Sequence, residues 1–170
     1  HEMVCLYDLT GQKILELKES NLSINSVSFS QDGKSILVCY DRKVSFYDVF
    51  GRALWTFEPG AHIGAACFFS NGSRVAVLGI AGMYILDKQG WKISEFPSLS
   101  ELPPSNISSD GGNLIFSTRS SNSLDMHGHV IQRFDDNSYD FSALCLSPDG
   151  KMVLRFSSEG KAILNHTANY

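Results

Sequence analysis

Two short signatures recur along the chain about every 39 residues, and this spacing restricts the possible folds more than any other feature. The first signature is a tight-turn dipeptide that lies between apolar runs. Its four copies are Asp32-Gly33, Asn71-Gly72, Asp110-Gly111 and Asp149-Gly150. A fixed period of this length indicates a repeat architecture, in which each unit buries its apolar faces against neighbouring units.

The second signature lies between copies of the first. It consists of an aromatic or leucine side chain, an aspartate, a glycine, and apolar residues three and six places after that glycine. The aspartates are Asp8, Asp48, Asp87 and Asp125, and the glycines are Gly11, Gly51, Gly90 and Gly128. Because two independent signatures keep the same phase through four copies, the sequence predicts four related structural units. The recurring apolar positions are expected to serve packing.

Residues 22–58 show what one unit forms. Residues 23–30 alternate apolar and small polar side chains, as a half-buried strand does, and the Asp-Gly turn follows. Residues 34–40 are almost continuously apolar, which is typical of a strand covered on both faces. Residues 43–49 and 53–59 complete four short antiparallel strands, the content of one β-propeller blade. The fourth strand has apolar residues three apart, so we expect a bulge or strong twist there.

We therefore predict an all-β fold, a β-propeller of about four blades with four antiparallel strands each. The chain reads as one domain over residues 1–170, forming part of a larger propeller. The expected units are the end of a blade at 1–19, blades at 20–58, 59–97 and 98–136, and an incomplete blade at 137–170. The pattern yields one strand more than four blades use. A self-closed four-blade ring and an open arc completed by another subunit are the alternatives.

Two stretches resemble the WD-repeat family: "LCLSPDGK" at residues 144–151 and "VSFYDVFGRALWTF" at residues 44–57. The Trp that precedes the Asp in that family is replaced here by tyrosine or leucine. The Gly-His pair that opens family repeats has its nearest counterpart in "GAH" at residues 60–62. The resemblance implies a propeller that binds other proteins. A looser resemblance links the repeats to pyrroloquinoline-quinone-type propellers.

Composition narrows the classes of partner. The formal net charge is −4, and no basic stripe is present, so nucleic acid is not an expected partner. No apolar run approaches the roughly 20 residues of a membrane-spanning helix. Cys5, Cys39, Cys67 and Cys145 lack metal-ligand or redox spacing, and each lies in an apolar run. We expect buried free thiols and a cytoplasmic location.

No residue set in the sequence predicts catalysis, a cofactor or a metal. His127 and His129 flank a turn glycine, and Asp135 and Asp136 lie together in a polar stretch, so both pairs are expected on solvated turns. The repeated aspartates are expected to cap turns. The four N-glycosylation sequons, at Asn21, Asn71, Asn106 and Asn165, are attributed to a composition rich in Asn and Ser. Trp55 and Trp91 are expected to pack in the core.

The function predicted from these observations is a non-catalytic scaffold that mediates protein–protein interactions within a larger assembly, with other proteins or peptides as partners. The alternative is a fragment of a propeller enzyme, quinoprotein-like or hydrolytic, whose active-site residues lie largely outside this stretch. RNA or translation-machinery binding would require a basic face. Completion of the ring by a further chain segment or another subunit remains open at this level.

Overall fold

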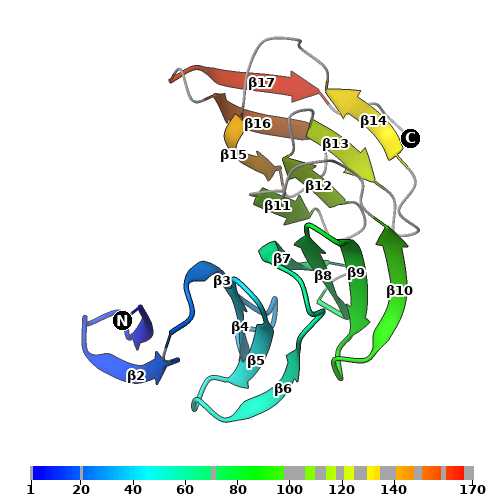
Figure 1. The fold of residues 1–170 in the computed structure, drawn as a ribbon. Helices are drawn as coiled ribbons and strands as arrows, with labels where there is room; N and C mark the ends of the chain where they lie inside the picture. Colours follow the sequence, from blue (N-terminus) through cyan, green and yellow to red (C-terminus); the bar gives the residue numbers. More distant parts are fainter. Residues whose placement is uncertain are drawn as a thin grey trace.

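The computed structural model describes residues 2–19, 21–69, 72–97, 106–109, 114–117, 121–124, 130–134, 141–147, 151–157 and 160–166. These residues form seventeen β-strands and no helix. Figure 1 shows the strands grouped into small sheets that follow one another along an arc. The all-β prediction and its strand count are therefore confirmed for the described part of the chain.

Each sheet consists of strands that are consecutive in sequence and antiparallel. The first is a hairpin of β1 (Met3–Tyr7) and β2 (Lys13–Lys18). The second contains β3 (Ile24–Phe29), β4 (Ser35–Tyr40), β5 (Val44–Asp48) and β6 (Ala53–Phe57). The third contains β7 (Ile63–Phe69), β8 (Arg74–Gly79), β9 (Gly82–Asp87) and β10 (Lys92–Pro97).

The remaining two sheets continue the same order. The fourth contains β11 (Asn106–Ser109), β12 (Leu114–Ser117), β13 (Ser121–Leu124) and β14 (Val130–Phe134). The fifth contains β15 (Phe141–Leu146), β16 (Met152–Ser157) and β17 (Ala162–His166). Three sheets of four strands thus lie between a two-stranded and a three-stranded sheet.

In the sheets of three or four strands, the first strand lies on the inner side of the arc (Figure 1). β7 contacts β3 and β4 of the preceding sheet and β11 of the following one, and β15 contacts β11 and β12. In Figure 1 the strands β6, β10 and β14 run along the outer side. This radial order is that of propeller blades, which pack face to face around an axis.

In the second and third sheets, the second strands β4 and β8 are buried on both faces, as their continuous apolar sequences predict. In β4, Ile36, Val38 and Tyr40 pack in one cluster with Leu17 of the β1–β2 hairpin. Leu37 and Cys39 point the other way and join Val75, Val77 and Leu86 of the third sheet. Since successive side chains of a strand point to opposite faces, one strand serves two interfaces.

The apolar residue three places after each repeat glycine is a β-bulge. The neighbouring strand has no pairing partner for Ile14, Leu54, Ile93 and Ile131. The residues directly before and after each of them are paired. The expected bulge in the outer strand is therefore confirmed. The expectation that these apolar positions serve packing is wrong for Ile14, Leu54 and Ile93, because all three side chains are exposed.

Two repeat glycines have a left-handed backbone conformation and lie against side chains of the preceding sheet. Gly51 and Gly90 have φ of +85° and +87°. A Cβ at Gly51 would lie 2.6 Å from Leu15 Cδ1, and one at Gly90 would lie 2.7 Å from the ring of Trp55. In both cases the outer strand of the preceding sheet lies against the turn. The Leu15 side chain can move away from a larger residue at Gly51, whereas the Trp55 ring is rigid, so a larger residue at Gly90 would push the neighbouring sheets apart.

The fifth sheet departs from the apolar pattern at one buried position. Arg155 is the fourth residue of β16, where β4 has Val38 and β8 has Val77, and only 2% of it is exposed. Its Nε and Nη2 donate hydrogen bonds of 3.1 and 2.8 Å to Oδ1 of Asn165 on β17. A buried cation needs polar partners, and the side-chain amide supplies one of them.

Candidate interaction surface

The repeated aspartate closes the turn between the third and fourth strands of a sheet. Oδ1 of Asp48 accepts hydrogen bonds from the backbone N–H groups of Phe50, at 3.1 Å, and Arg52, at 2.9 Å. The backbone N–H of Asp48 donates to the carbonyl of Arg52, and that of Gly51 donates to the carbonyl of Asp48. The carboxylate thus satisfies two amides that a five-residue turn would otherwise leave without acceptors.

The other two described copies of this turn have the same geometry. Asp8 accepts from the N–H groups of Thr10 and Gln12, and Asp87 accepts from those of Gln89 and Trp91, all at 2.8 to 2.9 Å. The prediction that these aspartates cap turns is confirmed at these three positions. Asp125 lies outside the described residues.

Hydrogen bonding also affects the ionisation of these turns. The side-chain hydrogen bond from Thr10 to Asp8, followed by the backbone hydrogen bond from Gln12, lowers the pKa of the Asp8 carboxyl below its ordinary value. A carboxyl with a depressed pKa in the folded state stabilises the fold above its unfolded-state pKa. That contribution is lost as the pH falls through the folded-state value.

The turn also yields a test of stability. Asp48→Ala removes the carboxylate oxygen that accepts hydrogen bonds from two backbone N–H groups. The change is expected to lower the free energy of unfolding by about 1 kcal/mol. Asp48→Asn keeps an Oδ1 acceptor and should retain most of that stability. The exposed pairing of Asp48 with Arg52 contributes little to the difference. Urea denaturation measures both variants, and an equal loss for the two would contradict a capping role.

All these turns lie at one end of the sheets. In an antiparallel sheet the first and third turns share one end, whereas the second turn and the connections between sheets lie at the other. A small cavity of about 210 Å³ confirms the shared end, because Ser30, Gln31, Asp32, Gly72 and Lys88 line it from turns of two adjacent sheets. We call this end the aspartate-turn end.

Charges at this cavity are balanced. The hydrogen bond from Ser30 Oγ to Oδ1 of Asp32, 2.6 Å long, lowers the pKa of Asp32 below its ordinary value, and the positive charge of Lys88 acts in the same direction. The lining therefore combines one ionised carboxylate with one lysine. This arrangement joins neighbouring turns and has no grouping that would activate a nucleophile.

Each described aspartate turn exposes an apolar pair. One member is on the turn or immediately after it, and the other is the bulge residue of the fourth strand. The pairs are Leu9 with Ile14, Phe50 with Leu54, and Trp91 with Ile93. Phe50 is 87% exposed and Trp91 is 74% exposed. We call these six residues the rim surface.

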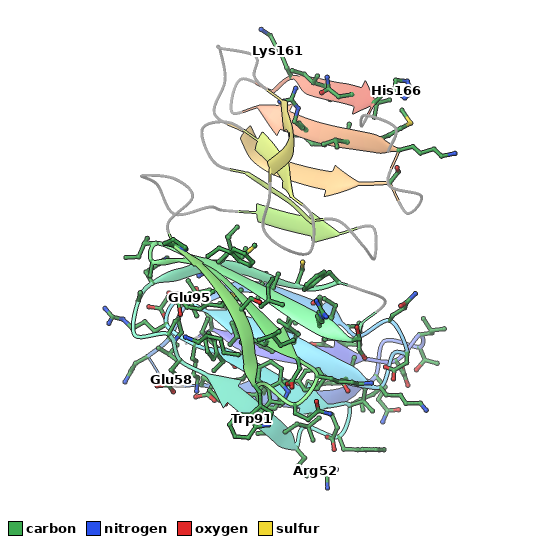
Figure 2. The ribbon with its side chains drawn as sticks, turned by 90° about the vertical axis from the view of Figure 1, so that its right-hand side faces the viewer. Arg52, Glu58, Trp91, Glu95, Lys161 and His166 are labelled. Carbon is green, nitrogen blue, oxygen red and sulfur yellow. The ribbon has the colours of Figure 1, made fainter. Side chains whose placement is uncertain are left out.

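Two basic side chains flank the rim surface, and each is paired with a carboxylate, Arg52 with Asp48 and Lys92 with Glu95. Arg52 follows the second described turn, and Lys92 is next to Trp91. Figure 2 shows Arg52 and Trp91 together at the bottom of the view, whereas Glu58 and Glu95 lie farther up. Exposed apolar groups rimmed by charge are typical of protein-binding surfaces.

The tryptophans differ from expectation in one respect. Trp55 packs in the core as expected, with its ring stacked on Phe46 at a centroid distance of 5.1 Å. The core prediction for Trp91 is wrong, because its side chain extends from the turn into solvent. The two residues differ in their position within the repeat. Trp55 lies four residues after Gly51, inside β6, and meets Gly90 of the next sheet, whereas Trp91 directly follows Gly90 and precedes β10.

The cysteines are free, but they are not uniformly buried. Cys39 is buried, Cys5 and Cys67 are half-buried, and Cys145 is exposed. The prediction of buried thiols is therefore wrong for Cys145, which lies on the first strand of the fifth sheet. Burial raises the pKa of the Cys39 thiol to about 12.

This difference predicts selective alkylation. At pH 8 and native conditions, iodoacetamide should label Cys145 at least ~100-fold faster than Cys39, because Cys39 is both inaccessible and protonated. Peptide mass spectrometry over time measures each site separately, and full labelling in urea is the control. Equal native rates would contradict the burial of Cys39.

The remaining expectations concern metals and membranes. No group of three or more metal-ligating side chains occurs among the described residues. His127, His129, Asp135 and Asp136 lie outside those residues, as does the prediction made for each of them. In the described part of the chain, no helix has the length and apolar character needed to cross a bilayer.

Comparison with known families gives one match. Residues 5–48 match the family described as WD domain, G-beta repeat. The matched segment extends from β1 to the end of β5 and contains the first aspartate turn. A search of curated proteins finds no match for the chain. WD repeats generally act as scaffolds for protein–protein interaction and are typically non-enzymatic. The chain therefore carries a segment that matches a WD repeat, and its successive antiparallel sheets have the strand order of β-propeller blades.

Proposed function

We propose that this chain is a non-catalytic scaffold that binds proteins or peptides through the rim surface. The observation that supports this proposal is the exposed apolar pair at the same end of three successive sheets. A pair repeated at this spacing offers several weak contacts to one extended partner. Linked contacts of this kind raise overall affinity through their high effective concentration.

The proposal also covers the setting in which the scaffold works. We place it in the cytoplasm, within a larger propeller and a larger assembly, and with neither nucleic acid nor membrane as partner. The formal charge of −4 supports the exclusion of nucleic acid, since a phosphate backbone requires a basic surface.

The test compares two ends of the same sheets. Phe50→Ser and Trp91→Ser together should weaken partner binding at least ~10-fold, because exposed aromatics contribute strongly to interfaces. Ile80→Ser is the control, since Ile80 is also an exposed apolar side chain, at 49%, but lies on the β8–β9 turn at the opposite end. Quantitative cross-linking mass spectrometry in cells measures partner occupancy of the three proteins.

Two results would overturn the proposal. One is an equal loss of partners in the Ile80 variant, which would remove any special role for the rim surface. The other is stoichiometric calcium or quinone in the purified protein by mass spectrometry. That result would favour the alternative, a segment of a propeller enzyme.

A further inference from the structure

The cavity of about 210 Å³ at the aspartate-turn end lies where three turns of two adjacent sheets meet. The β3–β4 turn supplies Ser30, Gln31 and Asp32, the β7–β8 turn supplies Gly72, and the β9–β10 turn supplies Lys88. The first two turns are in contact, since a Cβ at Gly72 would lie 3.7 Å from Cβ of Gln31. The cavity therefore lies on the same end of the sheets as the rim surface.

Two exposed aromatic residues of the rim surface flank this cavity. The backbone N–H of Val49 donates to the carbonyl of Lys34 at 3.2 Å, which joins the turn of Phe50 to the β3–β4 turn. On the other side, Lys88 and Trp91 belong to the same aspartate turn. The cavity thus lies between the turn of Phe50 and the turn of Trp91, and a segment that contacts both turns passes next to it.

The carboxylates at this end already accept hydrogen bonds from their own turns. Oδ1 of Asp32 accepts from Ser30 Oγ at 2.6 Å and from the backbone N–H of Lys34 at 3.1 Å. Asp48 and Asp87 each accept from two backbone N–H groups. Hydrogen bonds of this kind stabilise the ionised carboxylate and offset part of its charge. The three carboxylates therefore have fewer free acceptor sites for a basic partner.

Cations outnumber these carboxylates on the turns of the second and third sheets and at the first positions of β8 and β10. The cations are Lys34, Arg52, Arg74, Lys88 and Lys92. Arg52 and Lys92 each pair with a carboxylate on the surface. Lys88 is exposed and forms no ion pair with a carboxylate of the described residues. It is therefore the cation of the cavity lining with which a partner can pair.

We propose that the segment bound by the rim surface is acidic. One aspartate or glutamate side chain of the partner enters the cavity and pairs with the ammonium group of Lys88, and apolar residues on either side of it contact Phe50 and Trp91. This inference rests on the proposed function, because it names the chemistry of the partner for the same surface. Charge complementarity of this kind selects among partners that offer similar apolar contacts.

The same arrangement disfavours two other occupants. A nucleic-acid strand repeats its negative charge at every phosphate, and it would meet the carboxylates of Asp32 and Asp87 close to Lys88. A purely apolar segment would remove water from the Lys88 ammonium without replacing its hydrogen bonds. A single carboxylate between apolar residues avoids both costs, since it supplies a charged acceptor at one point only.

The experiment selects random peptides, displayed on phage, with the purified chain and with two charge-reversal variants. The first variant is Lys88→Glu. It keeps the backbone carbonyl that accepts a hydrogen bond from the Trp55 indole, so this contact between the two sheets is preserved. The matched control is Arg42→Glu, which changes the net charge equally. Arg42 is also exposed, but it lies on the β4–β5 turn at the opposite end.

We expect the unchanged chain and Arg42→Glu to select peptides with an aspartate or glutamate between apolar residues. Lys88→Glu should instead select lysine or arginine at that position, because the sign of the cavity charge is reversed. For the tightest peptide of the unchanged chain, titration calorimetry should give a Kd at least ~10-fold higher with Lys88→Glu. Lys88→Gln removes the charge without reversing it and should raise the Kd by a smaller factor.

The possible failures of the two proposals are distinguishable. Selected peptides that lack acidic residues, yet bind more weakly to the variant with Phe50→Ser and Trp91→Ser, would overturn this inference and support the proposed function. Acidic peptides that need Lys88 but bind this double variant unchanged would overturn the proposed function and the apolar contacts inferred above. A uridine oligonucleotide that displaces the selected peptide, and does not bind Lys88→Glu, would identify nucleic acid as the occupant and overturn the inference. Selection of no peptide would overturn both proposals.

Discussion

Gly82→Ala is expected to lower the free energy of unfolding by about 3–4 kcal/mol, because the change combines backbone strain with overpacking. Gly82 begins β9 and has φ of +134°. A Cβ there would lie 2.1 Å from the carbonyl oxygen of Phe96 and 3.0 Å from the carbonyl carbon of Pro97. Both atoms belong to the backbone of β10, so relief requires the two strands to separate.

Gly11→Ala is the matched control for this prediction. Gly11 has φ of +86°, but a Cβ there would meet nothing within 4 Å. Its cost is therefore that of the left-handed conformation alone, about 1 kcal/mol. Chemical denaturation of the two variants gives both free energies. Equal losses would show that the close approach of β10 contributes nothing.

Trp55→Ala is expected to have the second-largest effect, a loss of about 2–3 kcal/mol. The Trp55 ring stacks on Phe46, lies against Gly90 of the next sheet, and donates its Nε1–H to the carbonyl of Lys88 at 3.0 Å. The truncation removes aromatic packing within one sheet and a hydrogen bond between two sheets. The residue is only half-buried, which keeps the loss below that of a fully buried tryptophan.

Two further variants separate the contributions of Trp55. Trp55→Phe keeps an aromatic ring and loses the hydrogen bond, for which we expect about 1 kcal/mol. Trp91→Ala should change stability by less than about 0.5 kcal/mol, because that side chain is mostly in solvent. Thermal and urea unfolding measure all three. A loss at Trp91 as large as that at Trp55 would contradict the structure.

Most of the fold could be predicted from the sequence because the same pattern recurs in each repeat. The Asp-Gly turns and the uninterrupted apolar run of residues 36–40 describe local geometry that recurs in each unit, so one interpretation is tested several times along the chain. The bulge at Leu54 was predictable as well, since apolar residues three apart do not fit a regular strand.

The rim surface could not be predicted in the same way. Ile14, Leu54 and Ile93 recur with the core residues and look like core residues in the sequence. Whether a recurring apolar side chain is buried depends on the direction in which the bulge turns it, and that direction is set by pairing with the neighbouring strand. The exposed Trp91 escaped prediction because it lies directly after the turn glycine and before the fourth strand begins.

The sequence by itself determined the unit: its period, its four antiparallel strands, its aspartate turns and the all-β class, because these follow from local backbone preference and from the alternation of apolar side chains. Only the tertiary structure decided what each face meets. Arg155 stands where other sheets have a buried valine, and it donates a hydrogen bond to the Asn165 side chain on the neighbouring strand. Val27 is exposed, whereas Ala66 at the same position of the next sheet is buried. Whether a side chain is buried depends on the neighbouring sheet as well as on the residue itself. The sequence of one repeat does not contain that neighbouring sheet.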